Sequence, residues 1–385
     1  MPSVSRVPKN PKTVPSTAPS GATYLDELRA IAVDAGLDNL GAAPAVEFAR
    51  ARAQIDNRIS RDLVNGMKFT FLRPERSTHP ERLVEGARSV LVGLLSYAHD
   101  DPVAVNVSSP HARIARYAWR DHYADLKTSL TAVAARLRLD GHRATVFADD
   151  NSIVDREAAW LAGLGWFGKN ANLLVPGAGS MFVIGCIVTT AEFPVVTPVA
   201  DACGPCSRCI PACPTGAIIE PGVIDGNRCL SWLLQKPGVF DPQFREALGD
   251  RIYGCDDCQS VCPPTKKSAH VTGRQSLQSH VDVLEWLALE DNALDAACDR
   301  WYVHGRDMTW VRRNLLVVLG NTGDPGDPRV VDTVRRYLSH ERAELRAHAV
   351  WAAGRLGLGS LLHADDPDPM VVHEMQNLPA LRGDL

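Results

Sequence analysis

Eight of the ten cysteines lie between Cys203 and Cys262, and this arrangement constrains the fold more than any other feature of the chain. They form C-x2-C-x2-C-x3-C-P from Cys203 and C-x2-C-x3-C-P from Cys255. The first spacing is the bacterial run that binds two [4Fe–4S] clusters, in which the fourth cysteine ligates the other cluster. The stretch is rich in Pro, Gly and Asp and has no apolar periodicity. Bound clusters would therefore have to supply its core.

The crossing rule divides the eight cysteines into two sets of four ligands. It leaves the second cluster with three thiolates, and Cys229 completes the set. The expected ligands are Cys203, Cys206, Cys209 and Cys262 for one cluster and Cys213, Cys229, Cys255 and Cys258 for the other. Zinc sites also use C-x2-C pairs, but they do not call for three closely spaced cysteines followed by proline twice. Cys186 and Cys298 lie in apolar runs and are expected to be buried small hydrophobic residues.

Composition limits the class of protein. The chain has 385 residues, enough for two or three domains, with 45% hydrophobic residues, 22% charged residues and a net charge of −4. These values exclude a disordered chain, a collagen-like chain and a nucleic-acid binder that works by bulk positive charge. The longest apolar stretch is interrupted by Glu192, Pro194 and Pro198, so no membrane-spanning helix is expected. Ten cysteines are too few for a disulfide scaffold, which favours a reducing compartment.

The chain is expected to contain a tail and three parts. Residues 1–22 hold five prolines and no continuous apolar run, which predicts a disordered tail. Residues 23–195 alternate helical and strand patterns, which predicts an α/β domain. Helices are expected over 23–35 and 126–139, and strands over 90–95, 144–147 and 181–188. The cysteine-rich part is taken as 196–275 and a helical part as 276–385.

The helical part contains an internal repeat. Residues 311–320 match 345–354 at an offset of 34 residues, with Arg312 over Arg346 and Gly320 over Gly354. A repeat of this length indicates stacked helix pairs. Two ordinary core helices with a chance similarity are the alternative.

Two motifs of the front part admit both a chemical and a structural interpretation. Asp149 and Asp150 follow the strand at 144–147, where an α/β sheet commonly places catalytic side chains, but Asp150, Asn151 or Ser152 could simply cap the next helix, expected over 153–164. Residues 163–168 fit G-x-G-x-x-G, yet they follow a helix and not a strand. This loop either allows close approach of a large flat ligand or forms a helix C-cap and turn.

Iron–sulfur clusters transfer single electrons, which is compatible with an electron carrier or with an enzyme that supplies its own active site. A carrier does not need a preceding domain of about 170 residues and a following repeat domain. Chain length therefore favours an enzyme.

Several motifs, in this order, resemble the epoxyqueuosine reductase family. They are AGLGWFGKNANLL (162–174), CGPCSRCIPACPTGAI (203–218), DGNRCLSWL (225–233), RIYGCDDCQSVCP (251–263), RRNLLVVLGN and HAVWAAGRLG. The resemblance covers about residues 23–360. It implies an α/β N-terminal domain with base-off cobalamin, a ferredoxin-like insert with two [4Fe–4S] clusters, and all-α HEAT-like repeats that grip the tRNA anticodon stem-loop.

The resemblance also implies residue roles. Asp149 falls on the catalytic acid of the family and is expected near the cofactor, and Arg156 falls on the arginine that faces the substrate. Ser231, Asp256 and Asp257 fall on positions near the corrin ring. The chain departs from the family pattern at residues 116–123 and 262–265, which leaves the cofactor contacts there open.

The implied reaction is the reduction of epoxyqueuosine to queuosine at the tRNA wobble position. A cytoplasmic monomer, an external low-potential electron donor and no membrane association are expected. The alternatives are a reductive dehalogenase-like corrinoid enzyme, which would be expected to look exported and to lack the repeats, and a ferredoxin-like carrier.

Arginine distribution suggests where RNA would bind. Residues 300–355 contain ten arginines and six acids, which predicts a basic patch that includes Arg312 and Arg346. Ion pairs within the repeats are the alternative for these arginines.

Overall fold

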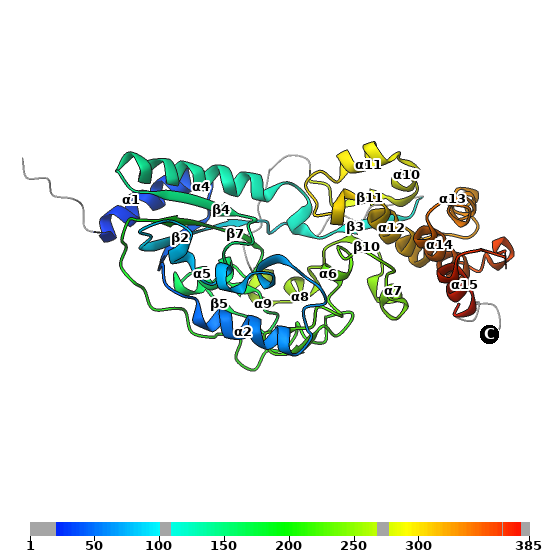
Figure 1. The fold of residues 1–385 in the computed structure, drawn as a ribbon, viewed down its shortest axis with the longest axis horizontal. Coiled ribbons are helices and arrows are strands. Elements are labelled where there is room, and N and C mark those ends of the chain that lie inside the picture. Colours follow the sequence, from blue (N-terminus) through cyan, green and yellow to red (C-terminus); the bar gives the residue numbers. More distant parts are fainter. Residues whose placement is uncertain (1–20, 101–108, 268–276, 364, 379–385) are drawn as a thin grey trace, which may run out of the picture.

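A four-stranded sheet forms the centre of the N-terminal part (Figure 1). The computed structural model describes residues 21–100, 109–267, 277–363 and 365–378, so nearly all of the predicted tail lies outside the described residues. The sheet order is β1-β2-β7-β4, with strands at Asn39–Pro44 (β1), Ser89–Ser96 (β2), Phe182–Thr189 (β7) and Ala144–Ala148 (β4). All three predicted strands are confirmed. Each neighbouring pair is antiparallel, which the alternation of strands and helices does not specify.

Helices cover both faces of this sheet, as Figure 1 shows. Helices α1 (Gly21–Asp34) and α4 (His122–Leu139) pack on the face that carries Leu91 and Leu95, and α5 (Asp155–Leu161) and α2 (Ala49–Ser60) lie on the face that carries Val92. Successive side chains of a strand point to opposite faces, so the continuous apolar run of β2 supplies both cores.

Two paired glycines allow α4 to lie close to the sheet. Gly93 of β2 is directly opposite Gly185 of β7. A Cβ atom at Gly93 would lie 2.8 Å from a methyl group of Leu130, and one at Gly185 would lie 2.6 Å from the other methyl group of the same leucine. Neither position can accept a larger residue without moving α4.

The cysteine-rich part consists of short elements joined to the rest of the chain through a mixed sheet. Its elements are β8 (Ile218–Glu220), β9 (Val223–Ile224), α6 (Leu230–Leu233), α7 (Pro242–Leu248), β10 (Arg251–Tyr253), α8 (Asp257–Ser260) and α9 (Pro263–Lys267). Strand β3 (His111–Ile114) pairs with β10 on one side and with β11 (His280–Asp282) on the other. Each of the three predicted parts thus contributes one strand to a single sheet.

The C-terminal part is helical and lies at the opposite end of the molecule from α1 (Figure 1). Its helices are α10 (Val283–Ala288), α11 (Asp291–Ala297), α12 (Thr309–Thr322), α13 (Pro328–Leu338), α14 (Ala343–Arg355) and α15 (Pro369–Gln376). The repeated segments form α12 and α14, which pack together: a Cβ atom at Gly320 would lie 2.6 Å from the Trp351 ring. One hydrophobic core runs from this part into β3, α6 and β10. Cys186 and Cys298 are fully buried, as predicted.

The arginines of the predicted basic patch are engaged with partners in the fold, which favours the ion-pair alternative. Arg312 is only 8% exposed and pairs with Asp291, and Arg346 pairs with Asp366 at 2.7 Å. All ten arginines between residues 300 and 355 form an ion pair or a hydrogen bond. Their partners appear in these contacts.

Within the described residues, none of the helices combines the length and the apolar character needed to span a bilayer.

Candidate active site and cysteine groups

The eight predicted cysteine ligands form two groups in space. Burial raises the pKa of Cys262, and the charges of Cys203 and Cys209 raise it further. Burial likewise raises the pKa of Cys209, and the charges of Cys203 and Cys206 add to that rise. These four thiols therefore lie close enough to influence one another, and they are the first cysteine group.

The second cysteine group is Cys213, Cys229, Cys255 and Cys258. Burial, followed by the charges of Cys255, Cys229 and Cys213, raises the pKa of Cys258 well above its usual range. The charge of Cys209, a member of the first group, also adds to the rise in the pKa of Cys258, so the two groups are neighbours. Burial raises the pKa of Cys255 to about 12, whereas Cys206 of the first group is exposed to solvent. The first group is therefore nearer to the surface.

The donor sets fit polynuclear clusters better than single ions. Among the described residues, no three His, Cys, Asp or Glu side chains converge closely enough to hold one metal ion. Four thiolates around a single zinc ion would each lie about 2.3 Å from it. The backbone N–H of Ala217 donates to Cys213 Sγ at 3.1 Å, a contact of the kind that tunes cluster-bound sulfur. Because clusters bind thiolates, the thiols with raised pKa must release their protons when a cluster binds.

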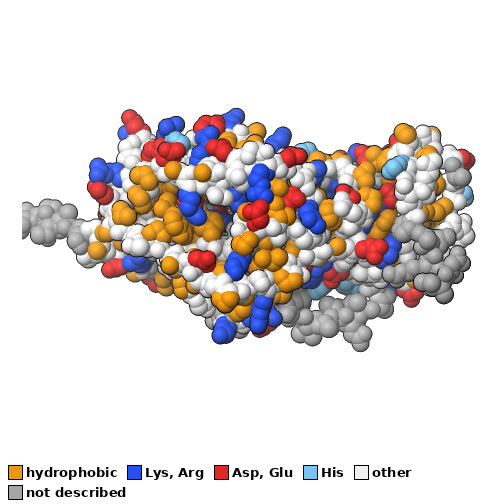
Figure 2. Space-filling view, turned by 90° about the horizontal axis from the view of Figure 1, so that it is seen from below, with side chains coloured by type: hydrophobic (Ala, Val, Ile, Leu, Met, Phe, Trp, Pro, Cys, Tyr) orange, Lys and Arg blue, Asp and Glu red, His pale blue; other side chains and the backbone are white. Residues whose placement is uncertain are grey.

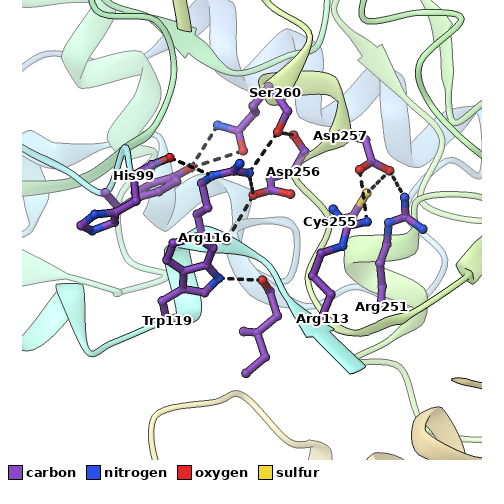
Figure 3. A network of polar contacts seen from close by, with 12 residues as sticks. His99, Arg113, Arg116, Trp119, Arg251, Cys255, Asp256, Asp257 and Ser260 are labelled. Atoms are coloured by element: carbon purple, nitrogen blue, oxygen red, sulfur yellow. Dashed lines mark hydrogen bonds and ion pairs between the residues drawn. The ribbon is translucent and has the colours of Figure 1, made fainter. Parts of the chain in front are cut away.

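Helix α8 carries Cys258 of the second group, and a buried ion pair just before it anchors the helix (Figure 3). Arg116 donates from Nη1 to Asp256 Oδ2 at 2.8 Å and to Ser260 Oγ at 3.1 Å, and its Nε donates to the His99 carbonyl. Asp256 is 4% exposed. Its carboxylate therefore holds α8 against the front part of the chain.

Asp257 is also held by arginines. Arg251 and Arg113 pair with its two carboxylate oxygens, and the Cys255 thiol lies 3.6 Å from Oδ2 (Figure 3). Neither Asp256 nor Asp257 presents a free carboxylate.

A second contact joins α8 to the front part. Gln259 is 6% exposed, and its Nε2 donates to the Tyr97 hydroxyl at 3.0 Å and to the Ser180 carbonyl at 2.8 Å. The cysteine segment is thereby fixed to the residues that follow β2 and precede β7.

Four tyrosines gather where the second cysteine group meets the front part. They are Tyr97, Tyr117, Tyr123 and Tyr253, called here the tyrosine group. The ring centroids of Tyr97 and Tyr117 are 6.4 Å apart, and those of Tyr117 and Tyr253 are 6.0 Å apart. Burial raises the pKa of Tyr117, and hydrogen bonding to Ser231 opposes that rise. Ser231 is two residues after Cys229, so the tyrosine group directly adjoins the second cysteine group.

Asp149 lies beside the tyrosine group, at the carboxyl end of β4. Its φ is +53°, a left-handed conformation that is uncommon for a non-glycine residue and frequent at functional sites. Partial desolvation raises its pKa, and the charges of Asp121 and Asp150 add to that rise. Burial raises the pKa values of Tyr123 and Tyr253, and the charge of Asp149 adds to both rises. A pocket of about 510 Å³ opens beside Asp121, with walls formed by Trp119, Arg120, Asp121, Gln278, Asp299 and Arg300.

The predicted cap of the following helix is wrong. Helix α5 begins at Asp155 after Val154, and no side chain caps it. The Asp150 carboxylate instead accepts from the Ser152 N–H at 2.7 Å in a local turn. The helix is also shorter than the predicted 153–164. Asp149 makes no capping contact either. In the first turn of α5 lie the partly buried Asp155 and the exposed Arg156. Burial raises the pKa of Tyr123, the charge of Asp155 adds to that rise, and the charge of Arg156 opposes it.

The glycine-rich loop is a helix end and a tight hairpin. Gly163 has φ +69°, and the N–H groups of Gly163 and Leu164 donate back to Trp160 and Ala159, which completes a Schellman cap. Strands β5 (Trp166–Phe167) and β6 (Leu173–Leu174) follow, and a Cβ at Gly165 would lie 2.3 Å from the Leu174 carbonyl. The capping interpretation is confirmed.

Sequence reasoning missed Tyr97, Tyr253 and Gln259. Gln259 lies within C-D-D-C-Q-S-V-C, so a polar side chain between the ligands was the available signal. Tyr97 directly follows the apolar strand β2, and Tyr253 ends β10 within the motif RIYGCDDCQSVCP, whose cysteines are the stronger signal.

Two family models match the chain. One, described as 4Fe-4S double cluster binding domain, matches residues 202–265, and one, described as Epoxyqueuosine reductase QueG, DUF1730, matches residues 77–150.

Similar proteins and structures agree with these matches. The epoxyqueuosine reductase of Vibrio cholerae serotype O1 is 36% identical over 71% of this chain and 76% of its own length, and that of Xanthomonas campestris pv. campestris is 32% identical over 86% and 96%. A crystal structure of epoxyqueuosine reductase with an epoxyqueuosine-modified tRNA stem loop superposes with a TM-score of 0.84 at 25% identity. It covers 93% of this chain and 98% of that one.

Proposed function

Because this chain belongs to the epoxyqueuosine reductase family, we propose that it is an oxidoreductase that reduces epoxyqueuosine to queuosine in tRNA. A dehalogenase-like enzyme and an electron carrier were the alternatives from sequence, and the family membership favours neither. The observation that carries the proposal is the junction of Asp149, the tyrosine group and the second cysteine group.

The chain contains a 4Fe-4S double cluster binding domain at residues 202–265. The ligand sets that we propose are the first and second cysteine groups, one cluster to each. The exposed Cys206 supports electron entry through the first cluster, and the deeper second group supports electron exit toward the tyrosine group. The donor would be an external low-potential reductant.

The junction also fits a cobalamin. Hydroxyl groups of the tyrosine group and Ser231 already bond within the protein, and their remaining donor or acceptor capacity would serve an amide-rich ring system next to the second cysteine group. When bound there, cobalamin would supply low-valent cobalt as the reductant of the substrate. Ser231 and Asp149 would contact it. Asp256 and Asp257 would act indirectly, since both are engaged with arginines, and would hold the cysteine segment in place next to the cofactor site.

Residues of the chain itself would donate protons and position the substrate. Conversion of the epoxide to an alkene consumes two electrons and two protons and releases the oxygen as water. Asp149 is the proposed proton donor to that oxygen, because its raised pKa keeps the carboxyl protonated to higher pH than usual. Arg156 is the proposed substrate contact, because it is exposed in the first turn of α5 and lies, like Asp149, near Tyr123, and because its planar guanidinium suits recognition of a substrate phosphate.

We propose that the chain consists of three parts, residues 23–195, 196–275 and 276–385. The sheet of β3, β10 and β11 joins them. The packing of α12 against α14 supports HEAT-like repeats. The partner is a tRNA, and the protein is proposed to work as a cytoplasmic monomer.

Expression in a bacterial strain that lacks its own epoxyqueuosine reductase tests this function. On nucleoside analysis, total tRNA should regain queuosine and lose epoxyqueuosine. With a Cys258→Ala variant, epoxyqueuosine should persist and queuosine should stay absent. Persistence of epoxyqueuosine with the expressed wild-type protein would contradict the proposal.

A further inference from the structure

The 65–77 segment, which follows α2, carries positive charge that the fold does not use. Lys68, Arg73 and Arg76 are exposed, and their side chains make no ion pair or hydrogen bond with any described residue. Glu75 is the only acid in the segment. This contrasts with the helical repeats, where all ten arginines between residues 300 and 355 have a partner.

The same segment carries apolar and aromatic surface. Phe69 packs edge-on against Trp232 of α6, with centroids 5.7 Å apart, and against Tyr302 at 5.6 Å. Tyr302 is 45% exposed and Leu72 is 61% exposed. Figure 2, seen from the α2 side, shows Lys and Arg side chains among hydrophobic side chains over the middle of this face.

Both ends of this surface are fixed to the candidate active site. The Val154 N–H donates to the Ser77 carbonyl at 3.0 Å, which joins the segment to the loop that follows Asp149. At the other side, the Tyr302 N–H donates to the Tyr253 hydroxyl at 2.8 Å, and Tyr253 belongs to the tyrosine group. The surface therefore forms a rim of the site.

A pocket of about 420 Å³ with cationic walls adjoins the first residue of the 65–77 segment. Asn65 lines it together with Arg228, Lys236 and Arg313, and Asp241 is the one acid among the described residues of its wall. Arg228 and Lys236, together with the buried Arg313 whose donors are taken by backbone carbonyls, outnumber this one acid, so the pocket has a net positive charge, which suits a phosphate group.

We propose that Lys68, Arg73, Arg76 and Tyr302 form a binding surface for the single-stranded loop of the substrate RNA. The cations contact loop phosphates, and the exposed face of Tyr302 stacks with a loop base next to the modified nucleotide. Proteins recognise single-stranded RNA by such a combination of splayed bases on aromatic rings and backbone phosphates on cations. This inference rests on the proposed function and names the surface that serves it.

A salt titration of RNA binding tests the cations. The probe is an anticodon stem-loop RNA that carries epoxyqueuosine, and the protein is the cluster-loaded full chain. The triple variant Lys68→Glu, Arg73→Glu and Arg76→Glu should bind at least about 10-fold more weakly, and its plot of log affinity against log salt should be shallower by up to about 2, since each single-strand phosphate contact contributes about 0.7. Lys127→Glu, an exposed cation on α4, is the matched control and should change neither quantity.

Binding by variants of Tyr302 tests the stacking. Tyr302→Ala should weaken binding of the stem-loop about 5- to 160-fold, the range expected for one stacked base, and Tyr302→Trp should retain it. A fully paired RNA duplex should bind both variants as it binds the wild type. The backbone N–H of residue 302 remains in both variants, so the contact to Tyr253 is preserved.

The outcomes separate the two proposals. Wild-type protein that fails to bind the stem-loop would overturn the proposed function. Wild-type binding with unchanged affinity and salt slope in the triple variant, or unchanged affinity in Tyr302→Ala, would overturn only the assignment of this surface.

Discussion

Arg116 Nη1 lies 2.8 Å from Asp256 Oδ2, and both side chains are more than nine-tenths buried. The pair links the turn after β3 to the loop between Cys255 and Cys258. A buried pair of this kind holds its geometry because either charge alone would be left without a partner in a low-dielectric interior.

Arg116→Met should therefore destabilise the protein by about 3–5 kcal/mol, since it leaves the Asp256 carboxylate buried and unpaired. Anaerobic denaturant unfolding measures this. Arg335→Met is the matched control: Arg335 pairs with Asp332 at the surface, and its loss should cost less than about 1 kcal/mol. The double variant Arg116→Met with Asp256→Leu should recover part of the loss. If Arg116→Met and Arg335→Met lowered the free energy of unfolding equally, the buried pair would not be what holds α8.

Cys229→Ala should remove one of two clusters, because no other cysteine joins the second group. Iron and sulfide analysis of the reconstituted protein should fall to about half of the wild-type value. Cys298→Ala is the control, since Cys298 is buried outside both groups, and it should retain full iron content. Full iron in Cys229→Ala would refute the ligand assignment.

Asp149→Asn should retain iron and RNA binding yet lose reduction by about 10²-fold or more, the usual contribution of a positioned general acid. Asp150→Asn is the matched control in the same turn and should lose far less. The reverse ranking in single-turnover nucleoside analysis would transfer the role to Asp150.

The pH dependence follows from the direction of the Asp149 pKa shift. Desolvation and the neighbouring acids raise this pKa, and the protonated carboxyl is the donor. Reduction should therefore fall as pH rises through the raised pKa and level off below it. Asp150→Asn should keep a falling limb, moved to lower pH because one repelling charge is gone. A profile that is flat, or that rises with pH in the wild type, would exclude Asp149 as the acid.

The local patterns were sufficient for several features. The cysteine spacing predicted the two groups that the fold brings together, and apolar runs located β2, β4 and β7. These signals are short-range, since a strand or a C-x2-C turn is specified by residues close in sequence.

Features that depend on distant partners could not be predicted. Arg312 and Arg346 look like surface cations in the sequence, but Asp291 and Asp366 neutralise them in the fold. Apolar runs covered on both faces do not reveal strand direction, so the antiparallel order was open. The tyrosine group brings together residues as distant as Tyr97 and Tyr253, and no single motif joins them.

The most direct test of the account is the reaction itself. Purified protein, reconstituted anaerobically with iron, sulfide and cobalamin and supplied with a low-potential reductant, is incubated with tRNA that contains epoxyqueuosine. Nucleoside mass analysis should then show queuosine, one oxygen atom lighter than its precursor, in amounts that depend on both cobalamin and Asp149. Unchanged epoxyqueuosine with full cluster content and bound cobalamin would contradict the central claim.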